Sequence, residues 1–192
     1  FTQWVIEDDF PAGRPPFERA GAQLVEDVEP FERMKLRMLN GSHSTMAYLG
    51  YLAGYDYISD VMGDADFTRL IHAMMTEEIM PTLDMPGVDL VAYRDQLLDR
   101  FRNPALKHRT WQIAMDGSQK LPQRLLNTIR ERIEAGHGFE RLGLGVAAWM
   151  RYVVGIDEKG ENIDVRDPLA LRMQAIAADA GGDAEALYIG LT

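Results

Sequence analysis

The chain has 192 residues, of which 46% are hydrophobic and 26% are charged, and this suits a single globular domain with one well-filled core. Its formal net charge of −10 argues against binding to nucleic acid, whose phosphates would be repelled. No apolar run reaches the roughly 18 residues of a membrane span, so no membrane contact is expected. The absence of cysteine excludes disulfides and thiolate metal sites. It also fits a reducing compartment, and we expect a cytoplasmic protein.

The first 28 residues are predicted to be extended. FTQWVIEDDF has the β-rich alternation of a strand, PAGRPPF breaks regular structure, and AQLVEDV is a second short strand candidate. Trp4, Val5 and Ile6 would be strand residues without a neighbouring strand. We therefore interpret residues 1–28 as a connector from a preceding domain and residues 29–192 as one helical domain.

The rest of the chain is predicted to be almost wholly helical. Pro30 suits the first turn of a helix and Gly54 its end, so one long helix is expected over 30–54. Asp64 or Asp66, and later Asp89, are the expected N-caps of two further helices. Helices are predicted over 66–80, 90–102, 107–115, 121–136, 138–155 and 167–180, with a polar turn at 116–120 and a charged loop at 156–167. The predicted fold class is mainly α with a short extended N-terminal segment.

One glycine pattern suggests a nucleotide loop. Gly143-Leu-Gly145-Val-Ala-Ala148 fits the loose G-x-G-x-x-[GA] pattern of dinucleotide-binding proteins. That loop needs a preceding strand, so that the free amides of a helix N-terminus meet the pyrophosphate. Here GFERL, the start of a helix, precedes it. We interpret the small residues as a place where two helices approach closely.

Three polar residues interrupt the long apolar helix in the stretch MKLRMLNGSHS: Lys35, Asn40 and His43. At ~100° per residue they fall at about 0°, 140° and 80° around an α-helix, on a face that also carries apolar residues. They have an explanation without function, in which Lys35 extends to solvent and the other two hydrogen-bond to a neighbouring loop. They would also suit a ketone–alcohol interconversion, in which a lysine with a burial-lowered pKa transfers the proton, an amide polarises the same oxygen, and a histidine holds an adjacent hydroxyl. Gly41 and Ser42 keep the helix thin where a neighbour or ligand approaches.

The pattern K-x-x-x-x-N-x-x-H, formed by Lys35, Asn40 and His43, resembles the active-site signature of the mannitol dehydrogenase family, the polyol-specific long-chain dehydrogenases. Two further blocks are similar to that family, QWVIEDDFPAGRPPFERAGAQLVEDV and RNPALKHRTWQIAMDGSQKLPQR, and the resemblance runs in order to about residue 180. It implies a two-domain enzyme in which an N-terminal Rossmann domain binds NAD. The second domain, helical and of the 6-phosphogluconate dehydrogenase C-terminal type, would bind a small polyol or sugar acid.

This chain is similar only to the second domain, and its end stops short of the family's final helices. The resemblance therefore implies that NAD is bound mainly by the missing domain, and we assign no cofactor-binding residue. It implies no metal. Because hydride donor and acceptor would meet between two domains, we expect the chain by itself to be inactive. The number of subunits stays open.

Carried over to this sequence, the resemblance makes Lys35 the general acid/base, Asn40 the oxyanion donor and His43 a contact to a substrate hydroxyl. Lys120 is similar to the lysine that reaches the substrate from the family's DGSxK turn. Gln112 stands where mannitol-type members carry an arginine. This departure favours the hexuronate branch, the fructuronate reductases (mannonate oxidoreductases) that interconvert D-fructuronate and D-mannonate, or their tagaturonate relatives.

A sugar acid also needs a cationic anchor for its carboxylate. His108, Arg109 and Arg124 are the candidates, and bidentate geometry favours an arginine without deciding which. Two alternatives to this enzyme stay open: a stand-alone helical interaction or regulatory module without catalysis, and a relative of the hydroxyacyl-type dehydrogenases. The lysine-centred signature counts against the second.

Overall fold

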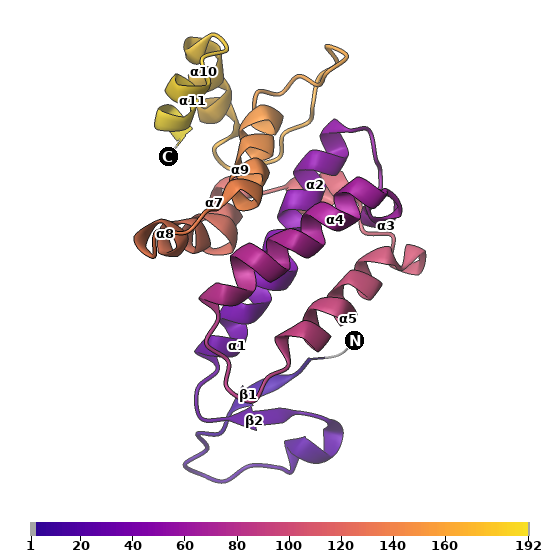
Figure 1. The fold of residues 1–192 in the computed structure, drawn as a ribbon, viewed down its shortest axis with the longest axis vertical. Helices are drawn as coiled ribbons and strands as arrows, with labels where there is room; N and C mark the ends of the chain where they lie inside the picture. The colour runs from indigo at the N-terminus through magenta and orange to yellow at the C-terminus, as the bar shows by residue number, and fades with distance from the viewer. Residues whose placement is uncertain (1–2, 192) are drawn as a thin grey trace.

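The computed structural model of the chain describes residues 3–191; residues 1, 2 and 192, which belong to the expected segments 1–28 and 29–192, lie outside the described part. Helices dominate, and the strands form one two-stranded sheet. Figure 1 shows this sheet at one end of the molecule and the last two helices at the other, with a helical body between them. The predicted mainly-α fold with a short extended N-terminal segment is confirmed.

The elements follow one another with short connections. In chain order they are β1 (Val5–Glu7), η1 (Phe17–Ala20), β2 (Gln23–Val25), α1 (Glu29–Met34), η2 (Lys35–Gly41), α2 (Ser42–Leu52), α3 (Ile58–Gly63), α4 (Ala65–Ala73), η3 (Met74–Ile79), η4 (Met80–Thr82), α5 (Leu90–Arg102), η5 (Pro104–Leu106), α6 (Thr110–Ala114), α7 (Gly117–Leu121), η6 (Pro122–Leu126), α8 (Asn127–Glu134), α9 (Glu140–Val153), α10 (Ala170–Ala180) and α11 (Ala184–Leu191). Of these, η2, η3 and η6 are π-helical, and η1, η4 and η5 are 3-10 turns.

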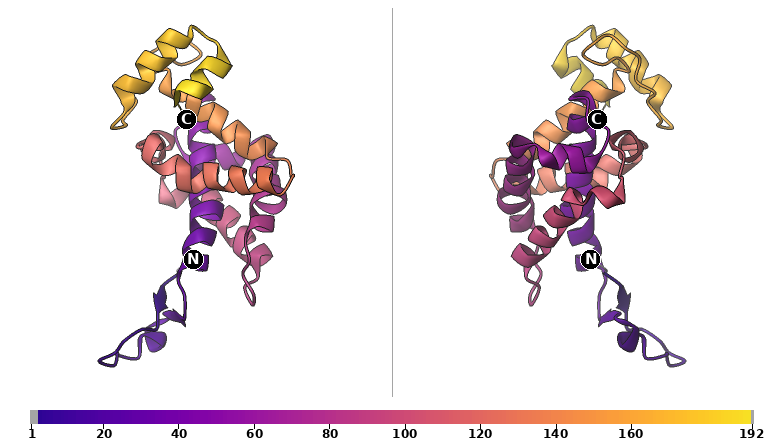
Figure 2. Two further views of the ribbon diagram at one scale, coloured as in Figure 1. Left: turned by 90° about the vertical axis from the view of Figure 1, so that its left-hand side faces the viewer. Right: turned by 90° about the vertical axis from the view of Figure 1, so that its right-hand side faces the viewer.

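The N-terminal segment forms a parallel strand pair. Val5 of β1 lies opposite Gln23 of β2, and Glu7 lies opposite Val25. Parallel strands need a crossover connection, which residues 8–22 supply as a loop with one 3-10 turn. Figure 2 shows that the pair and its loop extend away from the helical body. Both strands are predicted from the sequence, but the expectation that Trp4, Val5 and Ile6 lack a neighbouring strand is wrong, because β2 pairs with β1. The division of the chain between residues 28 and 29 stays a prediction.

The helix predicted over 30–54 is confirmed as one helical run over residues 29–52. Gly54 follows it with a φ of 87°, the left-handed conformation in which helices often end. The run contains the π-helical segment η2, which the sequence pattern did not predict. Gly41, at the end of η2, lies against η6, because a Cβ there would lie 2.7 Å from the Arg124 carbonyl oxygen. The expectation that Gly41 thins the helix for a neighbour is therefore confirmed.

The core is built around α2. Its Met46 and Tyr48 are fully buried, and the helix packs against α9 and α6. α9 approaches α2 most closely at Gly145, where a Cβ would lie 2.5 Å from the Thr45 hydroxyl oxygen. Segment 143–148 lies inside α9 and follows a turn at Gly136. Its interpretation as a close contact between helices, and not as a nucleotide loop, is confirmed.

Helix boundaries follow the predicted caps in two cases. Asp64 caps α4 and Asp89 caps α5, each accepting a hydrogen bond from a backbone N–H of the first turn. The polar turn predicted at 116–120 is wrong, because α7 forms there. Its start is held by Asp167, whose carboxylate accepts hydrogen bonds from the Ser118 N–H at 2.8 Å and hydroxyl at 2.6 Å. This partner is 49 residues away, so local sequence does not reveal the helix.

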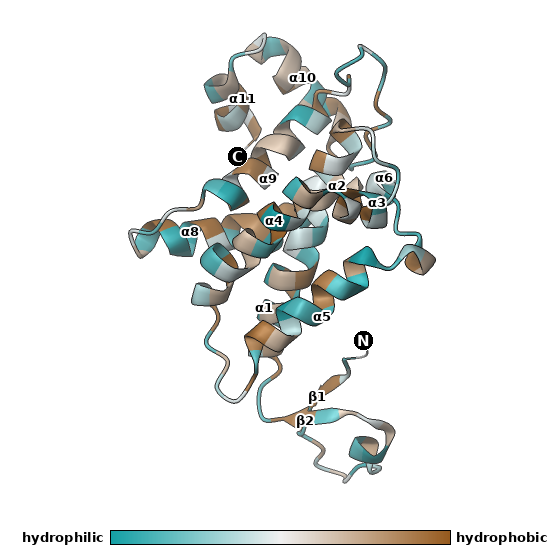
Figure 3. Ribbon diagram, turned by 45° about the vertical axis from the view of Figure 1, so that its right-hand side comes forward, coloured by the Kyte–Doolittle hydropathy of each residue, from teal (hydrophilic) through white to brown (hydrophobic). Residues whose placement is uncertain are grey.

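Polar and apolar residues are mixed along the helices. Figure 3 shows hydrophilic and hydrophobic residues alternating around α5 and α8. None of the helices in residues 3–191 combines the length and the apolar character that crossing a bilayer requires. The helix α11 lies beyond the last predicted helix, and its Ile189 is largely exposed, as is Leu171 of α10.

Candidate active site

Lys35 is the first residue of the π-helical segment η2, and its side chain is exposed within residues 3–191. It lines a recess of about 250 Å³ together with Trp4, Val28 and Phe31, at the junction between the helical body and the strand pair. The recess therefore sets two aromatic rings near the lysine. The described residues alone do not give Lys35 the partial burial expected from the sequence. A substrate or a covering domain would be needed to desolvate the ammonium group.

Asn40 lies five residues after Lys35 in the same π-helical segment, in which hydrogen bonds join residues five apart. The Asn40 side-chain oxygen is buried and has no hydrogen-bond partner in the described part of the chain. This oxygen can accept a hydrogen bond from a substrate hydroxyl, whereas only the amide nitrogen of Asn40 can donate one.

His43 lies on the first turn of α2, half-buried among aromatic rings. Its ring centroid lies 4.6 Å from that of Phe101 and 5.4 Å from that of His108. Burial, and then the nearby His108, Arg100 and Arg124, lower the pKa of His43 from its ordinary value to about 3. The imidazole is therefore neutral near pH 7. Its Nε2 atom is buried and unpartnered among residues 3–191, so it can hydrogen-bond to a substrate hydroxyl.

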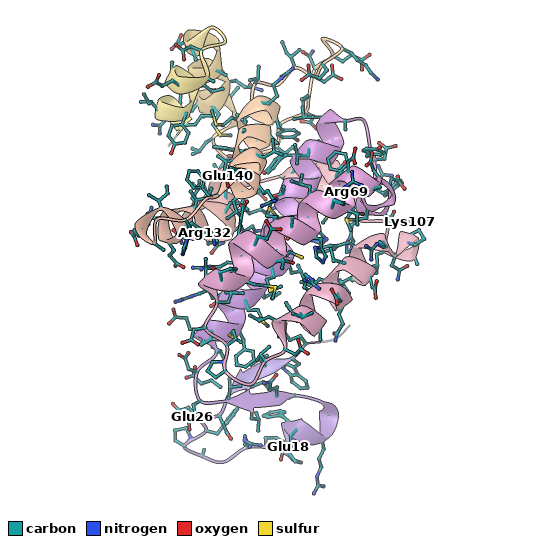
Figure 4. The ribbon with its side chains drawn as sticks, viewed as in Figure 1. Glu18, Glu26, Arg69, Lys107, Arg132 and Glu140 are labelled. Carbon is teal, nitrogen blue, oxygen red and sulfur yellow. The ribbon has the colours of Figure 1, made fainter. Side chains whose placement is uncertain are left out.

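Two cations border the same region. Lys120 of α7 donates to the Met115 carbonyl oxygen at 2.6 Å and lies 3.8 Å from the Asp116 carboxylate. Burial, and then the charge of Arg124, lower the pKa of Lys120. Arg124 of η6 donates to the Ser44 hydroxyl at 3.1 Å. Arg124 thus contacts α2 and lies near His43, and its charge also reaches Lys120. Figure 4 shows nitrogen-bearing side chains gathered between α5 and the helices beside it.

These features agree with comparisons to known proteins. A sequence model of the mannitol dehydrogenase C-terminal domain matches residues 27–188. The chain belongs to the mannitol dehydrogenase family. It is 55% identical over 194 residues to D-mannonate oxidoreductase of Escherichia coli, with 100% of this chain and 40% of the relative covered. It is 44% identical over 185 residues to a mannitol dehydrogenase of Saccharomyces cerevisiae, with 95% of this chain and 37% of the relative covered.

A solved member of the family has the same fold. Mannitol 2-dehydrogenase of Pseudomonas fluorescens, in a ternary complex with NAD and D-mannitol, matches with a TM-score of 0.89 and 40% identity, covering 97% of this chain and 38% of that one. The chain thus spans about two fifths of the length of the relatives that it matches. The relatives are oxidoreductases.

Two residues that the sequence predicts to bind the substrate, Arg109 and Gln112, show no contact with His43, Lys120 or Arg124 in the described part of the chain. Arg109 stacks over the ring of Tyr57, 5.8 Å from its centroid, and is exposed. Gln112 is exposed on α6 and makes no hydrogen bond in the described part of the chain. Their roles in this member of the mannitol dehydrogenase family stay predictions. No group of three or more His, Asp or Glu side chains within residues 3–191 is arranged to hold a metal ion.

Arg100 lies near the site but is not among the site residues that the sequence predicts. It lies near the end of α5, in the charged run DRFR, and no motif marks it. Its charge lowers the pKa of both His43 and His108, so its guanidinium group lies near both imidazoles. The family pattern does not include this residue, and only the packing of α5 against the site reveals it.

Proposed function

We propose that this chain is the substrate-binding part of an NAD-dependent oxidoreductase that interconverts a keto-hexuronate and an aldonate, D-fructuronate and D-mannonate. The observation that carries the proposal is that His43 lies beside His108 and near Arg100 and Arg124, while buried polar atoms of Asn40, His43 and both arginines have no partner within residues 3–191. The 55% identity to D-mannonate oxidoreductase over the whole chain supports this substrate pair. The solved relative binds NAD, which supports the same cofactor here.

In this proposal the chain's residues manage the oxygen and its proton. NAD, held mainly by a preceding domain, would supply the hydride chemistry at the carbon that carries the oxygen. In the reducing direction the Lys35 ammonium group gives its proton to the carbonyl oxygen as that carbon is reduced, which leaves a secondary alcohol and a neutral amine. The Asn40 amide donates a hydrogen bond to the same oxygen and stabilises its developing charge. The neutral His43 ring binds an adjacent hydroxyl and fixes the orientation of the substrate.

The exposure of Lys35 is consistent with a cofactor held by another domain. The lysine and the rings of Trp4 and Phe31 line an open recess at the surface, where a second domain can bring the hydride donor to the substrate. The segment 143–148 does not fit a nucleotide, because it lies within α9, with no strand before it, and its Gly145 packs against Thr45 of α2.

A neutral polyol/ketose pair is the second candidate substrate. The relatives named mannitol dehydrogenases support it, as does the D-mannitol in the solved complex. The cluster of cations beside His43 favours the sugar acid, because a guanidinium group binds a carboxylate far better than it binds a hydroxyl.

The test is the substitution Lys35→Ala in the longer protein to which this chain is proposed to belong. We expect kcat for D-fructuronate reduction to fall by roughly 10²- to 10⁴-fold, the usual contribution of a general acid. Lys35 is exposed, so the free energy of unfolding should change by less than about 0.5 kcal/mol. Lys159→Ala, at an exposed lysine in the charged loop, is the matched control and should leave kcat unchanged. Full turnover in Lys35→Ala would remove the mechanism and favour a module without catalysis.

A further inference from the structure

Most arginines of this protein either pair with a carboxylate or are exposed to solvent. On α5 itself, Arg94 bonds to the Asp95 carboxylate at 2.7 Å and Arg102 bonds to that of Asp99 at 3.2 Å. Arg100, between them in sequence, has no carboxylate partner within residues 3–191, although it is half-buried. Its Nε atom is buried and makes no hydrogen bond in the same range.

Arg124 has the same unusual status. It is half-buried, its Nε atom is buried and unpartnered among the described residues, and its one hydrogen bond there goes to the neutral Ser44 hydroxyl. Among the other arginines in residues 3–191 that lack a carboxylate partner, Arg132 is half-buried and donates to the Gly138 carbonyl oxygen at 2.8 Å, and the rest are exposed. A partly buried guanidinium group without a counter-ion is costly. The chain has a formal net charge of −10, yet no carboxylate in the described part pairs with Arg100 or Arg124.

The two arginines flank the same histidine from opposite elements. Arg100 comes from α5 and Arg124 from η6, and both bear electrostatically on His43 of α2. His108 lies against the same ring, with centroids 5.4 Å apart, and carries no carboxylate partner in the described chain. The groups around His43 are thus cationic or neutral donors, which is the chemistry of an anion site.

We propose that Arg100 and Arg124 form the subsite that binds the substrate's carboxylate and so selects a sugar acid over a neutral sugar. This inference rests on the proposed function, since it places the carboxylate relative to the reacting oxygen. Asn40, which binds that oxygen, and His43 are three residues apart, or ~4.5 Å along a helix. The carboxylate of a keto-hexuronate sits at the opposite end of a six-carbon chain from the ketone. A substrate with its ketone at Asn40 and a middle hydroxyl at His43 therefore extends its carboxylate toward Arg100 and Arg124.

The experiment compares D-fructuronate with D-fructose, its neutral counterpart, in the full-length protein. Arg100→Gln should raise KM for D-fructuronate about 10- to 100-fold, the loss of a charge-assisted hydrogen bond, with a much smaller change in kcat. Its kcat/KM for D-fructose should stay the same or rise. Arg102→Gln, two residues along α5 and ion-paired at the surface, is the matched control and should change neither substrate. Arg100→Lys should be intermediate, because it keeps the charge but loses the planar fork.

Equal losses for the two substrates in Arg100→Gln, or no loss for either, would overturn the carboxylate subsite. If the protein turns over neither substrate, the proposed function fails, and the subsite is then judged by calorimetric titration with D-mannonate and with D-mannitol. Binding of D-mannonate alone, abolished by Arg100→Gln and kept by Arg102→Gln, would support the subsite without the reaction. Equal binding of both ligands, or none, would overturn it.

Discussion

The imidazole of His43 meets that of His108 edge to face, with ring centroids 5.4 Å apart. Neither ring has a carboxylate partner within residues 3–191; His108, Arg100 and Arg124 act on His43, and Arg100 acts on His108. Burial and these neighbours lower the pKa of both histidines. Both imidazoles therefore favour the neutral form. This keeps His43 available as a hydrogen-bond partner for a hydroxyl group over a wide pH range.

The lowered pKa of His43 predicts a pH-dependent stability. In the unfolded chain a histidine takes up a proton near pH 6.5, whereas folded His43 does so only near pH 3. Below pH 6.5 the unfolded state thus binds more protons, so the stability that neutral His43 provides is present above pH 6.5 and is lost as the pH falls. Between pH 7.5 and pH 5.0 the free energy of unfolding of the unaltered protein should fall by about 2 kcal/mol more than that of the His43→Gln variant. Urea unfolding at the two pH values measures this, and parallel losses in the two proteins would contradict it.

Gly41 predicts a second effect on stability, because its Cα lies against the backbone of η6. Gly41→Ala would set a Cβ 2.7 Å from the Arg124 carbonyl oxygen, and the backbone must move to relieve the contact. We expect a loss of about 1–3 kcal/mol in the free energy of unfolding. Gly63→Ala is the matched control, because a Cβ at that helical glycine meets nothing within 4 Å. This second variant should be neutral or more stable by up to about 1 kcal/mol.

The Gly41→Ala variant should also raise KM for the substrate, since η6 carries Arg124 into the site. Unfolding curves and kinetics of the two glycine variants check both effects. Unchanged stability in Gly41→Ala would mean that η6 and η2 can separate freely.

The sequence could predict the helices and the signature residues because those depend on local patterns. Asp89 at a helix start, Gly54 at a helix end and the apolar periodicity between them act within a few residues. The π-helical segment escaped prediction because its cause is not local. It follows from the fit of η2 against η6, whose closest point is the contact between Gly41 and Arg124.

Lys35, Asn40 and His43 share one helical run, so their spacing in the sequence relates them, and their roles in the site stay predictions. Arg100 was not predictable, because its place beside His43 depends on how α5 packs, and its neighbours in sequence give it the look of a surface charge. Helix α7 was not predictable for the same reason, because Asp167, which stabilises its start, follows α9 in the sequence, 49 residues after Ser118.

Arg37 on η2 forms an ion pair that should contribute more to stability than a surface pair does. Its side chain is 5% exposed, and its two terminal nitrogens donate to the Glu131 carboxylate at 2.6 and 2.5 Å. This bidentate pair lowers the pKa of Glu131, so its stabilisation is present at neutral pH and is lost as the pH falls below the ordinary value of a glutamate. Glu131→Gln leaves the Arg37 charge buried, although Glu131 itself is 42% exposed, and should cost about 1–2 kcal/mol.

Its control is the exposed pair of Arg33 and Glu29, which also lies on the long N-terminal helix. Glu29→Gln should cost less than about 0.5 kcal/mol. Thermal or urea unfolding at pH 7 compares the two variants. Equal costs would show that burial of Arg37 adds nothing to the pair.

The last prediction concerns the chain on its own. Residues 3–191 contain helices packed on helices and one short strand pair, and their one glycine pattern of the dinucleotide type lies within α9, where Gly145 packs against α2. A dinucleotide needs a helix N-terminus that follows a strand and presents free backbone amides to the pyrophosphate. Calorimetric titration of the isolated chain with NADH should therefore give no binding heat, and a mixture with D-fructuronate should show no oxidation of NADH. The full-length protein is the positive control for both measurements. Micromolar binding of NADH to the isolated chain would mean that the hydride donor is held by the helical domain, and the division of labour proposed for the two domains would be wrong.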